Sequence, residues 1–87
     1  MPQLNKKKLR KILQFIKTQR ESKGYSQEYV AYKIGITQSA YQKLESGRLS
    51  LKVIHVLHLS DVLDFTLSAI DAYLASDPDI NPALSSS

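Results

Sequence analysis

Four side chains in segment 38–46 can donate hydrogen bonds from one side of a helix: Gln38, Ser39, Gln42 and Lys43. At helical spacing they lie opposite Tyr41 and Leu44. Glutamine can form two hydrogen bonds with adenine, and lysine can donate to O6 and N7 of guanine. A good bidentate contact contributes about 1–3 kcal/mol of discrimination against the wrong base. Any surface helix has a polar outer face, however, so the surrounding sequence decides between base reading and simple solvation.

Metal and catalytic chemistry have weaker support in the sequence. His55 and His58 are three residues apart, and Asp61 follows at the same spacing. A zinc site needs at least three well-placed ligands, and we interpret the histidines as surface residues. The chain has no cysteine, and no paired carboxylates, nucleophile with an adjacent base or phosphate-binding glycine loop is recognisable. We therefore predict that the protein is not an enzyme and holds no metal or cofactor.

Charge is divided unequally along the 87 residues. Residues 1–52 contain all 12 Lys and Arg and three Glu, a balance of +9, whereas residues 53–87 contain five Asp and no Lys or Arg, a balance of −5. This asymmetry would orient the basic end toward a polyanion such as double-stranded DNA. The apolar run Ile12-Leu13 near the amino terminus is too short for a signal peptide or membrane span. We expect a cytoplasmic protein, associated with the nucleoid through DNA and without a membrane partner.

Periodicity and capping residues predict five helices: residues 5–23, 27–34, 38–46, 51–63 and 67–75. Four of them are expected to begin after a Ser or Thr N-cap: Ser26, Thr37, Ser50 and Thr66. The first three are expected to end at glycine: Gly24, Gly35 and Gly47. No strand pattern is evident, so the predicted fold class is all-α. One domain is expected over residues 1–75, followed by a flexible tail over residues 76–87.

Apolar side chains predict the inner face of each helix. The expected stripes are Leu9, Ile12, Leu13 and Ile16 in the first helix and Val53, Val56, Leu57, Ser60 and Leu63 in the fourth. Ala31 and Gly35 predict a close crossing of two short helices, because a small side chain fits at the contact and glycine permits a tight turn. Asp64 is expected to end the fourth helix with a left-handed backbone, which aspartate tolerates at modest cost.

Three segments of the basic half follow one another in order: Gly24–Ala31, Ile34–Ser39 and Leu44–Arg48. Their residues and spacing resemble the phage-repressor-like (Cro-type, or XRE) helix-turn-helix family, with similarity from about Ile16 to about Ile70. The resemblance implies a five-helix bundle of the lambda-repressor-like DNA-binding type with a central helix-turn-helix. It also implies that the third helix lies in the major groove and reads bases with Gln38, Ser39, Gln42 and Lys43.

Residues around this motif are expected to hold the DNA backbone: Gln27, which resembles a family glutamine, and Thr37, Arg48, Lys52 or Lys43, and Arg20. Gln27 would bind phosphate at a helix N-terminus, where unpaired N–H groups favour an anion. Arg20 has a second expected partner in Glu45, and we favour this structural pair over a phosphate contact. Tyr41 stands where the family usually has a β-branched aliphatic residue. Its hydroxyl needs a partner, so we expect a tilted helix or a ring that reaches a phosphate.

The expected function is that of a dimeric transcriptional repressor or autoregulator that binds a palindromic operator, because one such motif offers few base contacts. The predicted homodimer surface consists of apolar residues in the last two helices: Ile54, Leu67, Ile70, Tyr73 and Leu74. The alternative is an antitoxin or another protein-binding adaptor, whose bundle would bind a toxin or other protein. The long basic first helix is expected either to pack on a partner subunit or to project as a basic arm.

Overall fold

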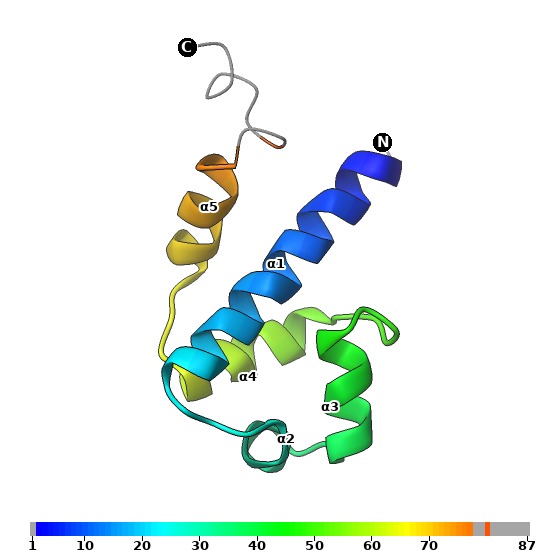
Figure 1. Cartoon of the computed structure of the whole chain (residues 1–87), viewed down its shortest axis with the longest axis vertical. Coiled ribbons are helices and arrows are strands. Elements are labelled where there is room, and N and C mark those ends of the chain that lie inside the picture. The colour runs from blue at the N-terminus through cyan, green and yellow to red at the C-terminus, as the bar shows by residue number, and fades with distance from the viewer. Residues whose placement is uncertain (1, 78–79, 81–87) are drawn as a thin grey trace.

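The computed structural model describes residues 2–77 and residue 80, with side chains from residue 6 onward. Five helices make up this part of the chain: α1 (Pro2–Ser22), α2 (Gln27–Ile34), α3 (Gln38–Glu45), α4 (Val53–Leu63) and α5 (Leu67–Ala75) (Figure 1). No strand occurs within the described residues, and the all-α prediction is confirmed. α1 packs against α3, α4 and α5, while α2 packs against α3 and α4.

Side-chain caps begin three of the helices as predicted. The hydroxyl oxygens of Ser26, Thr37 and Thr66 each accept a hydrogen bond from the backbone N–H three residues on, at 3.0–3.1 Å. Each bond satisfies an N–H group that has no partner inside the helix, and such a cap contributes about 1 kcal/mol. At the other end of a helix, Asp64 ends α4 with φ 57° and ψ 54°, the left-handed backbone that was expected there.

Two helix starts differ from the sequence prediction. α4 begins at Val53, and its N-cap residue is Lys52 rather than Ser50. The N–H of Lys52 donates to Nδ1 of His55 at 3.3 Å. The imidazole of His55 therefore accepts a hydrogen bond at the start of this helix, where the hydroxyl of Ser50 was expected to do so. α1 begins at Pro2, three residues before the predicted start. The fixed φ of proline suits the first position of a helix, where its missing N–H costs nothing.

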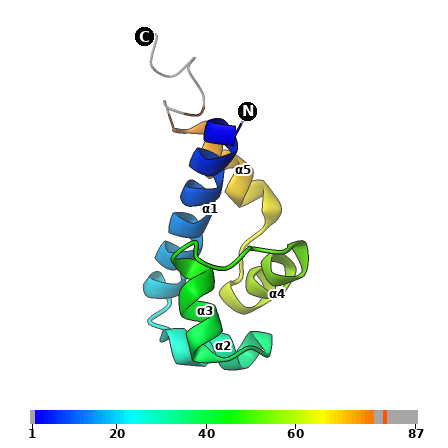
Figure 2. The same ribbon diagram turned by 90° about the vertical axis from the view of Figure 1, so that its right-hand side faces the viewer.

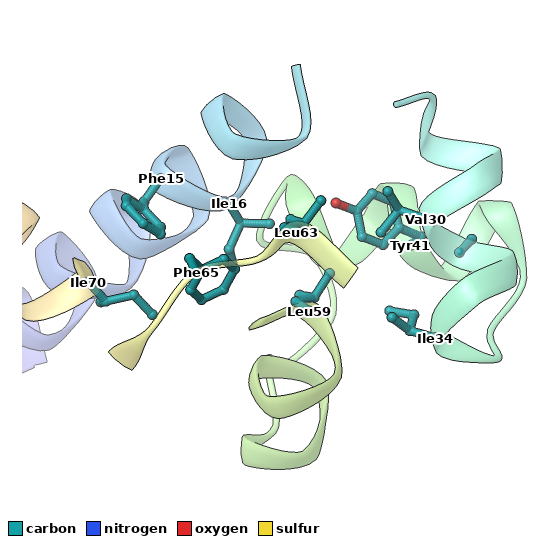
Figure 3. Packing of buried hydrophobic residues seen from close by; sticks show 10 residues of the cluster. Phe15, Ile16, Val30, Ile34, Tyr41, Leu59, Leu63, Phe65 and Ile70 are labelled. Atoms are coloured by element: carbon teal, nitrogen blue, oxygen red, sulfur yellow. The ribbon is translucent and has the colours of Figure 1, made fainter. Parts of the chain in front are cut away.

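The core is one apolar cluster drawn from all five helices and the loop before α5. Figure 3 shows members of this cluster: Phe15, Ile16, Val30, Ile34, Tyr41, Leu59, Leu63, Phe65 and Ile70. The rings of Phe15 and Phe65 meet edge to face with centroids 5.2 Å apart, and the ring of Tyr73 lies 5.4 Å from that of Phe15. Aromatic pairs of this kind add about 0.5–1.5 kcal/mol beyond simple burial. They fasten α5 and its preceding loop to α1.

The inner faces of α4 and α1 differ in part from the predicted stripes. In α4, Leu59 is fully buried, whereas Val53 and Leu57 are 75% and 45% exposed. α4 is apolar on nearly every side, so the period of its sequence does not identify the face that packs inward. In α1, Leu9 is 39% exposed and Phe15, which lies outside the predicted stripe, is buried.

The predicted tail begins with residues that remain attached to the bundle. α5 ends at Ala75, and Nζ of Lys11 in α1 lies 2.9 Å from Oδ2 of Asp77. Apart from Ile80, the remainder of the predicted tail lies outside the described residues. The ion pair therefore holds the start of this segment beside α1.

Two further features of residues 2–77 and 80 concern the apolar length of the helices and the placement of possible metal ligands. None of the helices there is by itself long and apolar enough to cross a membrane; α4 and α5 reach that length only as a pair bent by 98°. The same residues contain no group of three or more His, Asp or Glu side chains placed to hold a metal ion. His55 instead accepts the hydrogen bond at the start of its own helix.

Candidate nucleic-acid interface

A short turn joins α2 to α3 and fixes the angle between them. Gly35 ends α2 with φ 79°, and its N–H bonds back to carbonyl groups in the last turn of that helix. The N–H of Ile36 donates to the carbonyl of Ala31 at 3.0 Å. A Cβ at Gly35 would meet no atom within 4 Å, so the positive φ rather than lack of space favours glycine here. Ala31 itself lies in the core cluster.

The outer side of α3 carries the four side chains predicted to read bases: Gln38, Ser39, Gln42 and Lys43. All four are exposed, and within the described part of the chain none of their side chains forms a hydrogen bond. Three of them line a hollow together with Ser46 and Arg48; Gln38, the first residue of α3, lies outside it. Figure 2 looks at this side of the molecule, with α3 nearest the viewer. The hollow thus brings predicted base-reading residues beside Arg48, a predicted phosphate ligand.

The inner side of α3 holds a buried network around the carboxylate of Glu45. Nε and Nη2 of Arg20 donate to its two oxygens at 2.9 and 3.0 Å. The hydroxyl of Tyr41 donates to Oε2 at 2.6 Å, and Nε2 of Gln27 donates to Oε1 at 3.1 Å. Nη1 of Arg20 donates to the backbone carbonyl of Tyr25 at 2.9 Å. One carboxylate therefore links α1, α2 and α3, and the predicted Arg20–Glu45 pair is confirmed.

The network shifts the protonation equilibria of its members. Burial raises the pKa of Glu45, but hydrogen bonds from Arg20, Tyr41 and Gln27 together outweigh it and hold that pKa below its ordinary value. The hydrogen bond to Glu45 raises the pKa of Arg20. Burial, and then the hydrogen bond to Glu45, raises the pKa of Tyr41. At neutral pH the network consequently contains one ion pair and an uncharged phenol.

Burial in this network changes two predictions about DNA contacts. Arg20 is 9% exposed and donates from all three of its guanidinium nitrogens, so we assign it to the fold and remove it from the phosphate-binding set. Tyr41 is fully buried, and the prediction that its ring reaches a phosphate is wrong. Its bulk is taken up by the core, and its hydroxyl finds its acceptor in Glu45.

The other predicted phosphate ligands lie around α3. Gln27 is the first residue of α2 and lines a second hollow, which extends to the C-terminal end of α3. Thr37 is exposed at the N-terminus of α3, where its hydroxyl caps the helix. Arg48 lines the hollow beside the base-reading residues. Lys52 is exposed at the start of α4 and lines neither hollow.

The residues predicted for the dimer surface are not gathered into one exposed patch. Ile70 is 7% exposed and belongs to the core, and Tyr73 and Leu74 are half-buried against that core. Ile54 and Leu67 are 51% and 56% exposed, but they lie in the first turns of two different helices. The prediction for Ile70 is wrong because one protomer already uses this side chain in its own core.

Three features of this region are absent from the sequence prediction. Ser46, the C-cap residue of α3, lines both hollows and also a third one beside Lys6 and Arg10 of α1. The sequence does contain a signal for the acceptor of the Tyr41 hydroxyl, because Glu45 follows at the i, i+4 spacing that brings helical side chains together. No local pattern in the sequence indicates that α1 lies close to the end of α3, because this contact joins residues far apart in the chain.

Comparison with known protein families gives one match over the central part of the chain. The model of a family described as helix-turn-helix matches residues 16–70, which is the extent predicted from the resemblance. No curated protein and no solved structure matches the chain. The matched region contains α2, α3, the Glu45 network and the exposed residues of α3, whereas the first four turns of α1 precede it.

Proposed function

The chain belongs to the phage-repressor-like helix-turn-helix family, which is a DNA-binding family, and from this premise we propose that it regulates transcription by binding one operator sequence. The outer side of α3 enters the major groove and reads base edges. One observation carries this proposal. Polar side chains on the inner side of α3 have their hydrogen-bond partners within the fold, whereas those on the outer side are exposed and have none among the described residues.

Each outer residue has a defined role in this proposal. Gln38 and Gln42 are one helical turn apart, and each can form two hydrogen bonds with adenine. Lys43 donates to O6 and N7 of guanine. Ser39 is short and accepts or donates at a base that lies close to the helix. Because α3 is held on its inner side, these side chains meet the groove from a fixed backbone.

The DNA backbone is held by groups around α3. Nε2 of Gln27 gives one of its hydrogens to Glu45, which leaves the other for a phosphate oxygen beside the N-terminus of α2. Thr37, Arg48 and Lys52 bind further phosphates in this proposal. The Glu45 network therefore orients Gln27 for the phosphate as well as holding α3.

A second copy of the chain is the proposed partner on DNA. The exposed apolar residues Val53, Ile54 and Leu57 share the first half of α4, and contact between two copies would remove them from water. A two-fold dimer reads two half-sites about 34–36 Å apart, so the operator is expected to be a palindrome. Occupying such an operator would make the protein a repressor or an autoregulator.

Selection of duplexes from a random pool tests this function directly. The full chain is equilibrated with the pool at two salt concentrations, and the bound duplexes are sequenced over several rounds. The proposal expects a palindromic sequence to be enriched and the enrichment to weaken in the Gln38→Ala/Lys43→Ala double variant. The proposed dimer is checked in the same samples by sedimentation equilibrium.

Two results would count against the proposal. Salt-sensitive binding without an enriched sequence would mean that the basic half only attracts phosphate, and the protein-binding adaptor or antitoxin would become the better reading. Enrichment of a single half-site by a protein that sediments as a monomer at high micromolar concentration would keep sequence reading but remove the dimer.

A further inference from the structure

The first four turns of α1 precede the region that matches the helix-turn-helix family, so membership of the family assigns them no role. They carry most of the basic residues of this helix: Lys6, Lys7, Lys8, Arg10 and Lys11. Lys11 forms an ion pair with Asp77. The other four are exposed, and within the described residues no side-chain hydrogen bond or ion pair engages them.

Part of this basic segment lies against the end of α3. Lys6 and Arg10 line a hollow with Leu9 and Leu13, and its other wall is formed by Ser46 and Gly47 after α3. A Cβ on Gly47 would lie 3.5 Å from Cδ1 of Leu13, which shows how closely this turn approaches α1.

Ser46 connects this hollow with the two beside α3. It also lines the hollow that contains Gln42, Lys43 and Arg48, and the one that contains Gln27 and Lys17. The three hollows therefore adjoin at one residue. Lys6, Arg10 and Lys17 follow one another at spacings of four and seven residues, which places them along one side of α1.

The two views of the ribbon place this basic side with the exposed side of α3. In Figure 1 the N-terminal end of α1, the loop after α3 and α3 itself all lie on the right of the molecule. Figure 2 looks at that side and shows the N-terminal half of α1 continuing beyond the end of α3. A duplex bound to the exposed side of α3 would therefore face the first turns of α1 as well.

We infer that these first turns of α1 form a second part of the DNA interface, in which Lys6 and Arg10 bind backbone phosphates beyond the bases that α3 reads. This inference rests on the proposed function, because α3 in the major groove is what brings the duplex past α1. Leu9 and Leu13 give the hollow an apolar floor against which a deoxyribose can pack. Lys6 and Arg10 supply the positive charge for the phosphates on either side.

The length of α1 sets how far this contact extends. At about 1.5 Å per residue, Lys6 lies roughly 16 Å along the helix from Lys17, a distance equal to about five base-pair steps of 3.4 Å along the axis of a duplex. The added contact thus falls outside the bases next to α3. It increases affinity for duplexes that extend beyond the half-site without changing which bases are preferred.

The test compares Lys6→Gln/Arg10→Gln with Lys8→Gln in the full chain. Lys8 is on the same helix, exposed, and about 160° around the axis from Arg10, so its substitution gives the effect of removing one positive charge from another side of α1. Dissociation constants are measured from 50 to 200 mM salt for two duplexes that contain the sequence enriched from the random pool. One duplex ends at the edges of that sequence, and the other continues for ten base pairs on each side.

With the longer duplex, loss of two phosphate contacts should lower the slope of log K against log salt by about 1.8. Between 50 and 200 mM salt, the affinity of the variant should then fall about twelvefold less than that of the parent. Lys8→Gln should leave the slope near that of the parent, and Lys6→Arg/Arg10→Lys should preserve it. Shortening the duplex should weaken the parent but not the Lys6→Gln/Arg10→Gln variant.

Equal slopes for the parent and Lys6→Gln/Arg10→Gln, with an enriched sequence still bound, would overturn the inference and leave the proposed function standing. A fall in slope for Lys8→Gln half that for Lys6→Gln/Arg10→Gln would also overturn it, because each charge removed would then have the same effect wherever it lies on α1. If the parent enriches no sequence, the proposed function fails and the inference fails with it. Circular dichroism of each variant verifies that the exposed substitutions leave the fold intact.

Discussion

The two sides of α3 carry polar side chains in opposite situations. On the inner side, the carboxylate of Glu45 accepts hydrogen bonds from Arg20, Tyr41 and Gln27. On the outer side, residues such as Gln42 and Lys43 are exposed and, within the described residues, form no side-chain hydrogen bond. A polar residue on a recognition helix is therefore informative about function only once its hydrogen-bond partners are known. Polar side chains that have hydrogen-bond partners within the fold hold the helix in place, and exposed polar side chains without such partners are available for a ligand.

The inner side also shows why a buried charge is acceptable here. Among the described residues, no buried side-chain nitrogen or oxygen lacks a hydrogen-bond partner. A buried charge is costly unless it is paired and hydrogen-bonded, and the Arg20–Glu45 pair meets both conditions. The network joins three helices through the carboxylate of Glu45. Loss of this carboxylate should therefore affect the fold before it affects DNA contacts.

The largest effect is expected for Glu45→Ala. This substitution leaves the guanidinium of Arg20 buried without its partner, and breaking a buried pair on one side costs about 3–5 kcal/mol. The free energy of unfolding, measured by urea denaturation, should fall by that amount. Glu28→Ala is the matched control, because Glu28 is exposed in the first turn of α2 and its charge should contribute only about 0.3–1 kcal/mol. Similar losses of unfolding free energy for both variants would show that Glu45 contributes no more to the fold than an exposed carboxylate.

A smaller loss is expected for Tyr41→Phe, which removes the hydroxyl and keeps the ring in the core. A hydrogen bond to a charged group contributes about 1.5–3 kcal/mol, and Glu45 would retain its bonds from Arg20 and Gln27. The unfolding free energy should fall within that range. The preferred DNA sequence should not change, because the ring is fully buried. A changed preference in a selection experiment would show that Tyr41 contacts DNA after all.

Low pH should weaken the Glu45 network on the inner side of α3 before it alters the exposed side chains on the outer side. The pKa of Glu45 is lowered in the fold, where hydrogen bonds from Arg20, Tyr41 and Gln27 outweigh the opposing effect of burial. The stability contributed by this carboxylate is therefore complete above its unfolded pKa of about 4.3 and is lost as pH falls through the folded pKa. The difference in unfolding free energy between the parent and Glu45→Gln, followed from pH 7 to pH 3, should narrow. A difference independent of pH would contradict the assignment.

The smallest effect on stability is expected for Gln42→Ala on the outer side. Gln42 is exposed and has no hydrogen bond within the described part of the chain, so the unfolding free energy should change by less than about 0.5 kcal/mol. Binding to the enriched duplex should weaken by about 1–3 kcal/mol. A marked loss of stability would mean that this side chain also supports the fold, and the distinction between the two sides would disappear.

Local signals in the sequence predicted much of the helix-turn-helix. Ser26 and Thr37 cap α2 and α3 as expected, and Gly35 adopts the positive φ that the turn needs. These features depend on residues close together in the chain, where type and spacing suffice. The pairing of Arg20 with Glu45 joins residues 25 apart, and it was expected only because the family resemblance supplied it.

The sequence was less informative where a segment offers several equivalent choices. α4 is apolar on most sides, so its buried face at Leu59 could not be distinguished from the exposed face at Val53 and Leu57. The sequence predicts Ile70 at an interface because it does not show how many apolar side chains the core of one chain can hold. Packing between distant segments decides both cases, and it also places Arg10 beside the turn after α3.

We propose that the outer side of α3 reads sequence while its inner side holds the fold. The most direct test is to measure DNA affinity and unfolding free energy together for Gln38→Ala/Lys43→Ala. We expect at least a tenfold loss of affinity for the enriched duplex, at about 1.4 kcal/mol per tenfold, and less loss for a scrambled duplex. Stability should stay within about 0.5 kcal/mol of the parent per substitution. Equal losses on both duplexes, or a large loss of stability, would contradict the claim.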